Sequence, residues 1–246
     1  GVYVLEQNEI ENLSLKKHEK KVLKKFYKNS NINKYYCDEH INTNQKYVLY
    51  LTRDLDLDIY PNIKKHLYKF RKIIENRSEE RGEMQAALKL GKWWVIFAAR
   101  KKKLFEEEKI VCPQRSPINT FAYSESEFYA SADVYFISNR EKKINLKYIL
   151  SILNSKLFFF WLKKKGKTKG NLLELLYKPL CEIPFKIFNK IEQDKLITII
   201  NKILEIRKIN NEVKNLEKQM NQIIYKNYNL SSDEIEFIEN FYPKNN

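Results

Sequence analysis

The sequence predicts an α+β fold, in which a mixed, twisted sheet carries packed helices and a long helical C-terminal region follows. Three observations support this prediction. Short apolar runs bounded by turn residues recur up to residue 137, as expected for strands. Apolar residues at spacings of three and four lie between these runs and beyond them, as expected for helices. Residues 191–225 contain neither proline nor glycine and keep the helical spacing.

Residues 1–45 are predicted to form an N-terminal connector segment. The apolar run at residues 2–5 has the character of a short strand. An apolar side surrounded by lysines then predicts an amphipathic helix before the polar break at residues 29–33. The apolar residues of this predicted helix are Leu15, Val22, Leu23 and Phe26.

Residues 46–186 are predicted to form the main domain. In its first part, Asp54, Asp56 and Asp58 alternate with apolar residues, which is the period of a half-buried extended segment. An apolar stripe with a basic opposite side predicts one long helix after Pro61. The predicted elements of this part are a strand at 47–51, the extended segment at 54–59, a helix over about 62–80 and a strand at 93–99.

The second part of this domain is predicted to hold short strands, a helix and a basic loop. Pro113 closes the first strand, and an aromatic run ends the helix. Small residues in Ala-Ser-Ala (130–132) suit a place where chains approach closely. The predicted elements are strands at 110–112 and within 128–137, a helix over 146–162, a lysine-rich loop at 163–171 and a proline-bounded exit at 179–184.

Residues 187–246 are predicted to form a helical C-terminal region. Asn210 and Glu217 interrupt its apolar seam, which weakens a self-sufficient coiled coil and suits a helix lying against a partner. Ser231, with Glu234 three residues later, has the pattern of a capping box that begins a short helix ending near Phe241. The apolar seam consists of Leu196, Ile199, Ile203, Ile206, Val213, Met220 and Ile224.

The net charge of +15 and the pI near 9.4 favour a polyanionic partner, most often nucleic acid. The alternative is that a lysine- and asparagine-rich composition reflects an AT-rich genome. No run of about 18 apolar residues occurs, so we expect no membrane span. The sequence has no signal-peptide pattern and begins at Gly1, which suggests a piece of a longer protein. Cys37, Cys112 and Cys181 lie in apolar contexts and predict free, buried thiols in a reducing cytoplasm.

The predicted basic loop is the sharpest candidate for contact with DNA. Five lysines in seven residues repel one another unless a polyanion is near, and Gly166 and Gly170 let the main chain approach a phosphate. Hydroxyl and amide groups there can donate to phosphates or base edges. The alternative is a solvated surface turn. The candidates are Lys163, Lys164, Lys165, Lys167, Thr168, Lys169 and Asn171.

Two further segments are candidates for DNA contact. Arg100, Lys101, Lys102 and Lys103 follow a predicted strand as a loop would, and are expected to position the DNA backbone. The second segment is residues 114–127, which begins with Gln114, Arg115 and Ser116. These three residues are candidates for base reading, because glutamine pairs with adenine and arginine with guanine. For these three residues, a structural turn after Pro113 is an equally good interpretation.

No motif for catalysis or metal binding stands out. Cys37 and His40 have a metal-ligand spacing without a second pair, and the aspartates near residue 56 are explained by a polar strand face. Glu107 and Lys109 resemble the end of a nuclease motif, but no Pro-Asp precedes them. The Asn/Asp-Pro-Pro-Tyr/Phe motif of adenine methyltransferases and a glycine-rich cofactor loop are absent from the sequence. We therefore expect this chain to lack catalytic activity by itself.

Four segments together resemble a known family. These are Lys-Ile-Val-Cys-Pro-Gln-Arg-Ser (109–116), Phe-Tyr-Ala-Ser-Ala-Asp-Val-Tyr-Phe-Ile (128–137), Lys-Tyr-Ile-Leu-Ser-Ile-Leu-Asn-Ser-Lys (147–156) and Pro-Leu-Cys-Glu-Ile-Pro (179–184). Their order is similar to that of the TaqI-like specificity domain of type IIG restriction-modification enzymes and N6-adenine DNA methyltransferases. Tyr60, Pro61, Leu67 and Phe70 match as well, and the resemblance covers about residues 47–240.

The resemblance implies a DNA target-recognition domain within a larger prokaryotic, cytoplasmic enzyme. Its implied partners are double-stranded DNA and the methyltransferase catalytic domain of the same parent protein. It implies no cofactor in this chain, with S-adenosylmethionine, and Mg²⁺ if a nuclease is present, in the parent. The alternatives are a module that binds nucleic acid without sequence preference and docks a protein through its C-terminal helix, and a self-contained nuclease.

Overall fold

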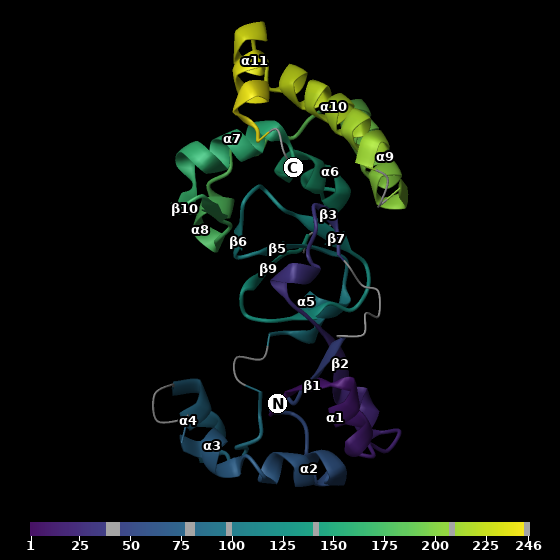
Figure 1. Cartoon of the computed structure of the whole chain (residues 1–246), viewed down its shortest axis with the longest axis vertical. Coiled ribbons are helices and arrows are strands. Elements are labelled where there is room, and N and C mark those ends of the chain that lie inside the picture. Colours follow the sequence, from purple (N-terminus) through teal and green to yellow (C-terminus); the bar gives the residue numbers. More distant parts are fainter. Residues whose placement is uncertain (38–44, 77–81, 97–99, 140–142, 207–209, 244–246) are drawn as a thin grey trace. The chain divides into compact units, whose positions relative to one another are not determined.

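The computed structural model describes residues 1–37, 45–76, 82–96, 100–139, 143–206 and 210–243. The chain has an α+β fold and divides into two compact units that are interleaved along the sequence (Figure 1). Unit 1 comprises Gly1–Tyr27, His40–Phe105 and Glu127–Tyr129, and unit 2 comprises Lys28–Glu39, Glu106–Ser126 and Ala130–Asn246. The boundaries expected at residues 45/46 and 186/187 stay a prediction.

Unit 1 contains an antiparallel sheet in which β4 pairs with both β1 and β2. Val48 of β4 lies opposite Val4 on one side and Lys24 on the other. The helix predicted to include Leu23 and Phe26 is wrong, because pairing with β4 holds both residues in a strand. The sheet order is β1 (Val4–Glu6), β4 (Lys46–Leu49), β2 (Leu23–Tyr27) and β8 (Tyr129–Ala130), with α1 (Gln7–Asn12) after β1 and the 3₁₀ helix η1 (Glu19–Val22) before β2.

The long helix predicted after Pro61 is interrupted. Hydrogen bonds from the amides of Lys69 and Phe70 to carbonyls three residues earlier tighten the chain, so one helix ends and another begins. Ile63 and Leu67, both fully buried, anchor the first helix in the core of unit 1. The helices are α2 (Pro61–Tyr68), α3 (Arg71–Asn76), α4 (Gly82–Lys89) and α5 (Lys102–Glu106).

Two extended segments predicted in unit 1 are also wrong. Asp56 accepts a hydrogen bond from the amide of Asp58 at 3.0 Å and caps the 3₁₀ helix η3 (Leu57–Ile59), so local side-chain bonding replaces the strand. Residues 93–96 form turns, with Trp93 buried in the core, whereas residues 97–99 lie outside the described part of the chain.

Unit 2 is built on a second sheet, whose strand β5 is buried along its whole length. β3 runs parallel to β7, and the other pairs are antiparallel. The strands predicted at 110–112 and within 128–137 are confirmed. The sheet order is β3 (Tyr35–Tyr36), β7 (Ala122–Ser124), β5 (Lys109–Pro113) and β9 (Val134–Ile137).

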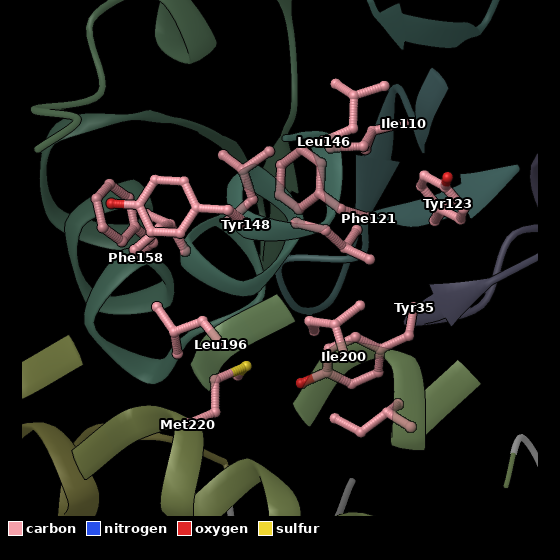
Figure 2. Close-up of a cluster of buried hydrophobic side chains, with 14 of the residues drawn as sticks. Tyr35, Ile110, Phe121, Tyr123, Leu146, Tyr148, Phe158, Leu196, Ile200 and Met220 are labelled. Carbon is pink, nitrogen blue, oxygen red and sulfur yellow. The ribbon is translucent and has the colours of Figure 1, made fainter. Parts of the chain in front are cut away.

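Helices cover this sheet and form one core with it. The predicted apolar seam is confirmed where the side chains are described: Leu196 and Met220 are fully buried, and Figure 2 shows them below Tyr148 and Phe158 in the core. The capping box at Ser231 and Glu234 is confirmed. The helices are α6 (Leu146–Leu153), α7 (Lys156–Lys165), α8 (Tyr177–Cys181), α9 (Lys190–Ile206), α10 (Asn210–Asn227) and α11 (Ser232–Phe241).

The polar seam residue Glu217 has its partners within unit 2. Its carboxylate accepts hydrogen bonds from Lys34 and Tyr35, both at 2.7 Å. Asn221, one turn further along α10, accepts a hydrogen bond from the amide of Lys156 at the start of α7. The seam therefore contacts this chain itself, and the side chain of Asn210 lies outside the described part.

The cysteine prediction needs one correction. Cys37 and Cys112 are free and buried, but Cys181 is exposed, because it ends the short helix α8 on the surface. The suggested partner of Cys37, His40, lies outside the described residues. Within the described ranges, no three His, Cys, Asp or Glu side chains gather as a metal site, and no helix has the length and apolarity to cross a membrane.

Candidate nucleic-acid interface

The lysine-rich segment is a helix end followed by a β-hairpin, in place of the predicted loop. Lys163, Lys164 and Lys165 form the last turn of α7, and Gly166 ends the helix. A Cβ atom at this position would collide with the carbonyl oxygen of Leu162, so the chain leaves the helix only through glycine. β10 (Lys167–Lys169) then pairs with β11 (Leu172–Glu174), which pairs with β6 (Arg115–Ser116).

Gly170 and Asn171 form the two-residue turn between β10 and β11. Gly170 has φ of +58°, and glycine at the first central position is typical of a type II′ hairpin turn. Lys163 of α7 donates a hydrogen bond to the carbonyl oxygen of Asn171 at 2.9 Å. This bond ties the turn of the hairpin to the end of the helix.

The strand register sorts the side chains of this three-stranded sheet onto two faces. Leu173 lies opposite Thr168 on one side and Ser116 on the other, and Leu173 and Ser116 are buried. Because side chains alternate along a strand, Glu174 and its cross-strand neighbours point the opposite way. Arg115 and Lys167 are exposed on this side, whereas Glu174 between them is buried. We call this the outer face, and it comprises Arg115, Lys167, Lys169, Leu172 and Glu174.

Glu174 joins two cations across three neighbouring strands. Its carboxylate accepts a hydrogen bond from Arg115 Nε at 3.0 Å and lies 3.4 Å from Lys167 Nζ. The hydrogen bond from Arg115, and then the charge and hydrogen bond of Lys167, hold the pKa of Glu174 below its ordinary value. Glu174 is therefore ionised at neutral pH. Arg115, Glu174 and Lys167 together carry one net positive charge.

The other lysines of the segment differ in whether their ammonium group contacts another side chain. The Nζ atom of Lys164 lies 5.0 Å from the centre of the Phe241 ring, a cation–π contact with α11. Lys165 and Lys169 are exposed and have no ion-pair partner in the described part of the chain. Thr168 and Asn171 are exposed at the edge strand and at the turn.

The segment beginning at Gln114 belongs largely to the core. The main chain of Gln114 bonds to Asp133 and Leu175, which fixes its place beside β11. Ser116 shares a hydrogen bond of 2.7 Å with the Thr120 hydroxyl, and both residues are buried. Residues 119–124 are buried as well, so of the first three candidates Arg115 is the most exposed.

The cluster at Arg100 to Lys103 lies in unit 1, whereas the hairpin lies in unit 2. Lys102 and Lys103 begin helix α5, so the predicted loop is wrong at these positions. The carbonyl oxygen of Arg100 accepts a hydrogen bond from the Tyr50 hydroxyl, while Lys101, Lys102 and Lys103 are exposed. Within unit 2 the structure brings together Arg115 and the hairpin lysines, and Arg100 to Lys103 belong to unit 1.

Glu174 is the charged residue of the outer face that the sequence did not single out. The signal was available, because Gly170 and Asn171 separate two short runs, as in a hairpin, and Glu174 lies two residues after Leu172 on the same face. Its pairing with Arg115 was not visible, because the two residues are 59 positions apart.

The comparison with known families identifies the class of this protein. The model of the TaqI-like C-terminal specificity domain matches residues 24–185, which is more than half of the chain. The chain therefore belongs to the family of TaqI-like specificity domains of restriction-modification enzymes, as the sequence resemblance predicted.

Curated relatives are type II methyltransferases. M.MjaIV of Methanocaldococcus jannaschii is 26% identical over 232 residues, covering 90% of this chain and 73% of that protein. M.HincII of Haemophilus influenzae is 35% identical over 102 residues, covering 38% of this chain and 20% of that enzyme. A solved structure of the type IIL restriction-modification enzyme MmeI in complex with DNA shares the fold, with a TM-score of 0.69 and 15% identity over 98% of this chain. This chain spans 33% of the MmeI chain.

Proposed function

We propose that this chain is the DNA target-recognition part of a site-specific adenine DNA methyltransferase in a restriction-modification system. It lays the outer face of the hairpin sheet and the end of α7 against double-stranded DNA. The observation that carries the proposal is the set of exposed lysines on one hairpin of a specificity-domain fold. The net charge of +15 supports it, because the phosphate backbone dominates DNA affinity.

The relatives support the same function. Type II methyltransferases match this chain in sequence, and a restriction-modification enzyme with the same fold was solved in complex with DNA. The specificity-domain family fits a chain without its own catalytic role. In the proposed division of labour, this chain selects the site, while a catalytic domain binds S-adenosylmethionine, any nuclease binds Mg²⁺, and the reaction takes place there.

The deciding experiment is selection of random duplex DNA by the purified chain at moderate salt with competitor DNA. A sequence reader enriches a short motif containing adenine. Binding without enrichment means that the chain is a module without sequence preference. If the chain binds no DNA, the hairpin is not a DNA-contact surface.

A pair of lysine variants tests the contact surface. Lys169→Ala removes an exposed cation of the outer face, whereas Lys226→Ala removes an exposed cation of α10. If Lys169 contacts a phosphate, its loss weakens binding to all sequences alike and lowers the slope of log K against log salt by about 1. Lys226→Ala leaves affinity and slope unchanged. Equal effects of the two variants would contradict the proposed surface.

A further inference from the structure

We infer that Arg115 reads a guanine in the DNA target and that Glu174 is the residue that positions it. This inference rests on the proposed function, since it assigns base reading within the outer face of the hairpin sheet. It differs from the general role of the lysines, which act as point charges and carry little sequence information.

The first support is the way the guanidinium of Arg115 is held. The carboxylate of Glu174 accepts from Nε at 3.0 Å, and no hydrogen bond within the described chain uses the two terminal nitrogens, Nη1 and Nη2. The Arg115 side chain is 40% exposed and that of Glu174 is 7% exposed. The Nε edge of the guanidinium is thus fixed by Glu174, while the parallel N–H donors of Nη1 and Nη2 on the other edge face solvent.

The second support is that the Glu174 side chain is itself held in place by its surroundings. Glu174 lies on β11, the central strand of the three, with β10 on one side and β6 on the other. Its second carboxylate oxygen faces Lys167 at 3.4 Å, so both oxygens are engaged. An arginine held in this way loses less conformational freedom on binding than a free one, which favours a specific contact.

The chemistry of this pair favours a guanine over a phosphate. Arginine donates two parallel hydrogen bonds to O6 and N7 of guanine, the commonest specific contact in the major groove. An ionised carboxylate beside the guanidinium repels a phosphate.

The test is selection of random duplex DNA by the 246-residue chain and four variants. Arg115→Ala removes the reader, Arg115→Lys keeps the charge without the planar fork, and Glu174→Gln keeps the shape of the positioning side chain without its charge. Lys169→Ala serves as the control for a contact without base specificity. Thermal unfolding of each variant confirms that it is folded before selection.

The expected wild-type motif contains a guanine. Both Arg115 variants lose the preference for guanine at one position by roughly tenfold and keep every other position. Glu174→Gln weakens the preference at that same position only. Lys169→Ala keeps the whole motif and binds all sequences less tightly.

Other outcomes overturn the inference and separate it from the proposed function. If the wild-type motif has no guanine, or if Arg115→Ala keeps the full motif, the assignment of Arg115 is wrong while the proposed function stands. If Arg115→Ala weakens all sequences alike and Arg115→Lys restores binding, Arg115 contacts a phosphate. If Glu174→Gln changes no position, or changes others, Glu174 is not the positioning residue. If the wild-type chain enriches no motif, the proposed function falls and the inference falls with it.

Discussion

The side-chain amide of Asn154 pairs with the main chain of Phe121 as a neighbouring strand would. Asn154 Oδ1 accepts from the Phe121 amide at 3.1 Å, and Nδ2 donates to the Phe121 carbonyl oxygen at 2.8 Å. Both residues are fully buried in unit 2. This pairing accounts for the break between α6 and α7, where the sequence predicts one helix over residues 146–162.

Replacing Asn154 is therefore expected to destabilise unit 2. Asn154→Ala leaves the buried amide of Phe121 without a partner, whereas the Phe121 carbonyl oxygen keeps the hydrogen bond from the Tyr35 amide at 2.8 Å. The loss costs about 2 kcal/mol in the free energy of unfolding. Asn171→Ala, at the exposed turn of the hairpin, is the matched control and changes stability by less than about 0.5 kcal/mol. Urea unfolding of both variants measures the difference. Equal midpoints would show that Asn154 is dispensable.

Glu19 is expected to stabilise the start of α2 in a way that depends on pH. Its fully buried carboxylate accepts from the amides of Lys16, Asn62 and Ile63. Burial alone raises the pKa of Glu19, but these hydrogen bonds and that of the Asn62 side chain outweigh it and hold the pKa below its ordinary value. The resulting stabilisation is present above the unfolded pKa near 4.3 and is lost as pH falls through the folded pKa.

The prediction for Glu19→Gln follows from that direction. At pH 7 the variant loses about 2 kcal/mol of stability around α2, and the difference from wild type narrows below about pH 4. Amide hydrogen exchange in α2 at several pH values measures the effect. Glu11→Gln, on the exposed side of α1, is the control and changes little. A penalty that stays constant down to pH 3 would rule out the ionised cap.

Gly166 and Gly170 are expected to respond differently to alanine. Gly166→Ala brings a Cβ into the Leu162 carbonyl, so the main chain must shift where β10 leaves α7. Gly170→Ala meets no atom within 4 Å but strains a positive φ, at a cost of about 1 kcal/mol. We expect Gly166→Ala to lower both the thermal midpoint and DNA affinity more than Gly170→Ala does. The reverse order would mean that the turn, and not the helix end, positions the hairpin.

Thiol labelling is expected to distinguish the three cysteines. Cys112 is fully buried, and burial raises the pKa of its thiol, so both access and the reactive thiolate are suppressed. Cys37 is buried as well, whereas Cys181 is exposed. In the folded protein an aromatic disulfide reagent labels one thiol rapidly, and Cys181→Ser abolishes that fast phase. Two rapidly labelled thiols would contradict the burial of Cys37 or Cys112.

Features that depend on neighbours along the chain could be predicted from the sequence. The capping box needs only Ser231 and Glu234, three residues apart, and the strand at 110–112 needs only its apolar run and Pro113. The apolar seam of α9 and α10 repeats within each turn of helix. The α+β class and the family resemblance follow from such local patterns, and both are confirmed.

Features that depend on distant partners were decided only by the tertiary structure. Leu23 and Phe26 fit a helix by spacing, but hydrogen bonds to β4 make them a strand. The β10–β11 hairpin has a local turn signal at Gly170 and Asn171, but its pairing with β6, more than 50 positions earlier in the chain, was decided by the tertiary fold. The same pairing places Glu174 against Arg115. The physical reason is that main-chain pairing and burial stabilise contacts between residues far apart in the sequence. A local sequence pattern does not specify which distant residue will be the partner.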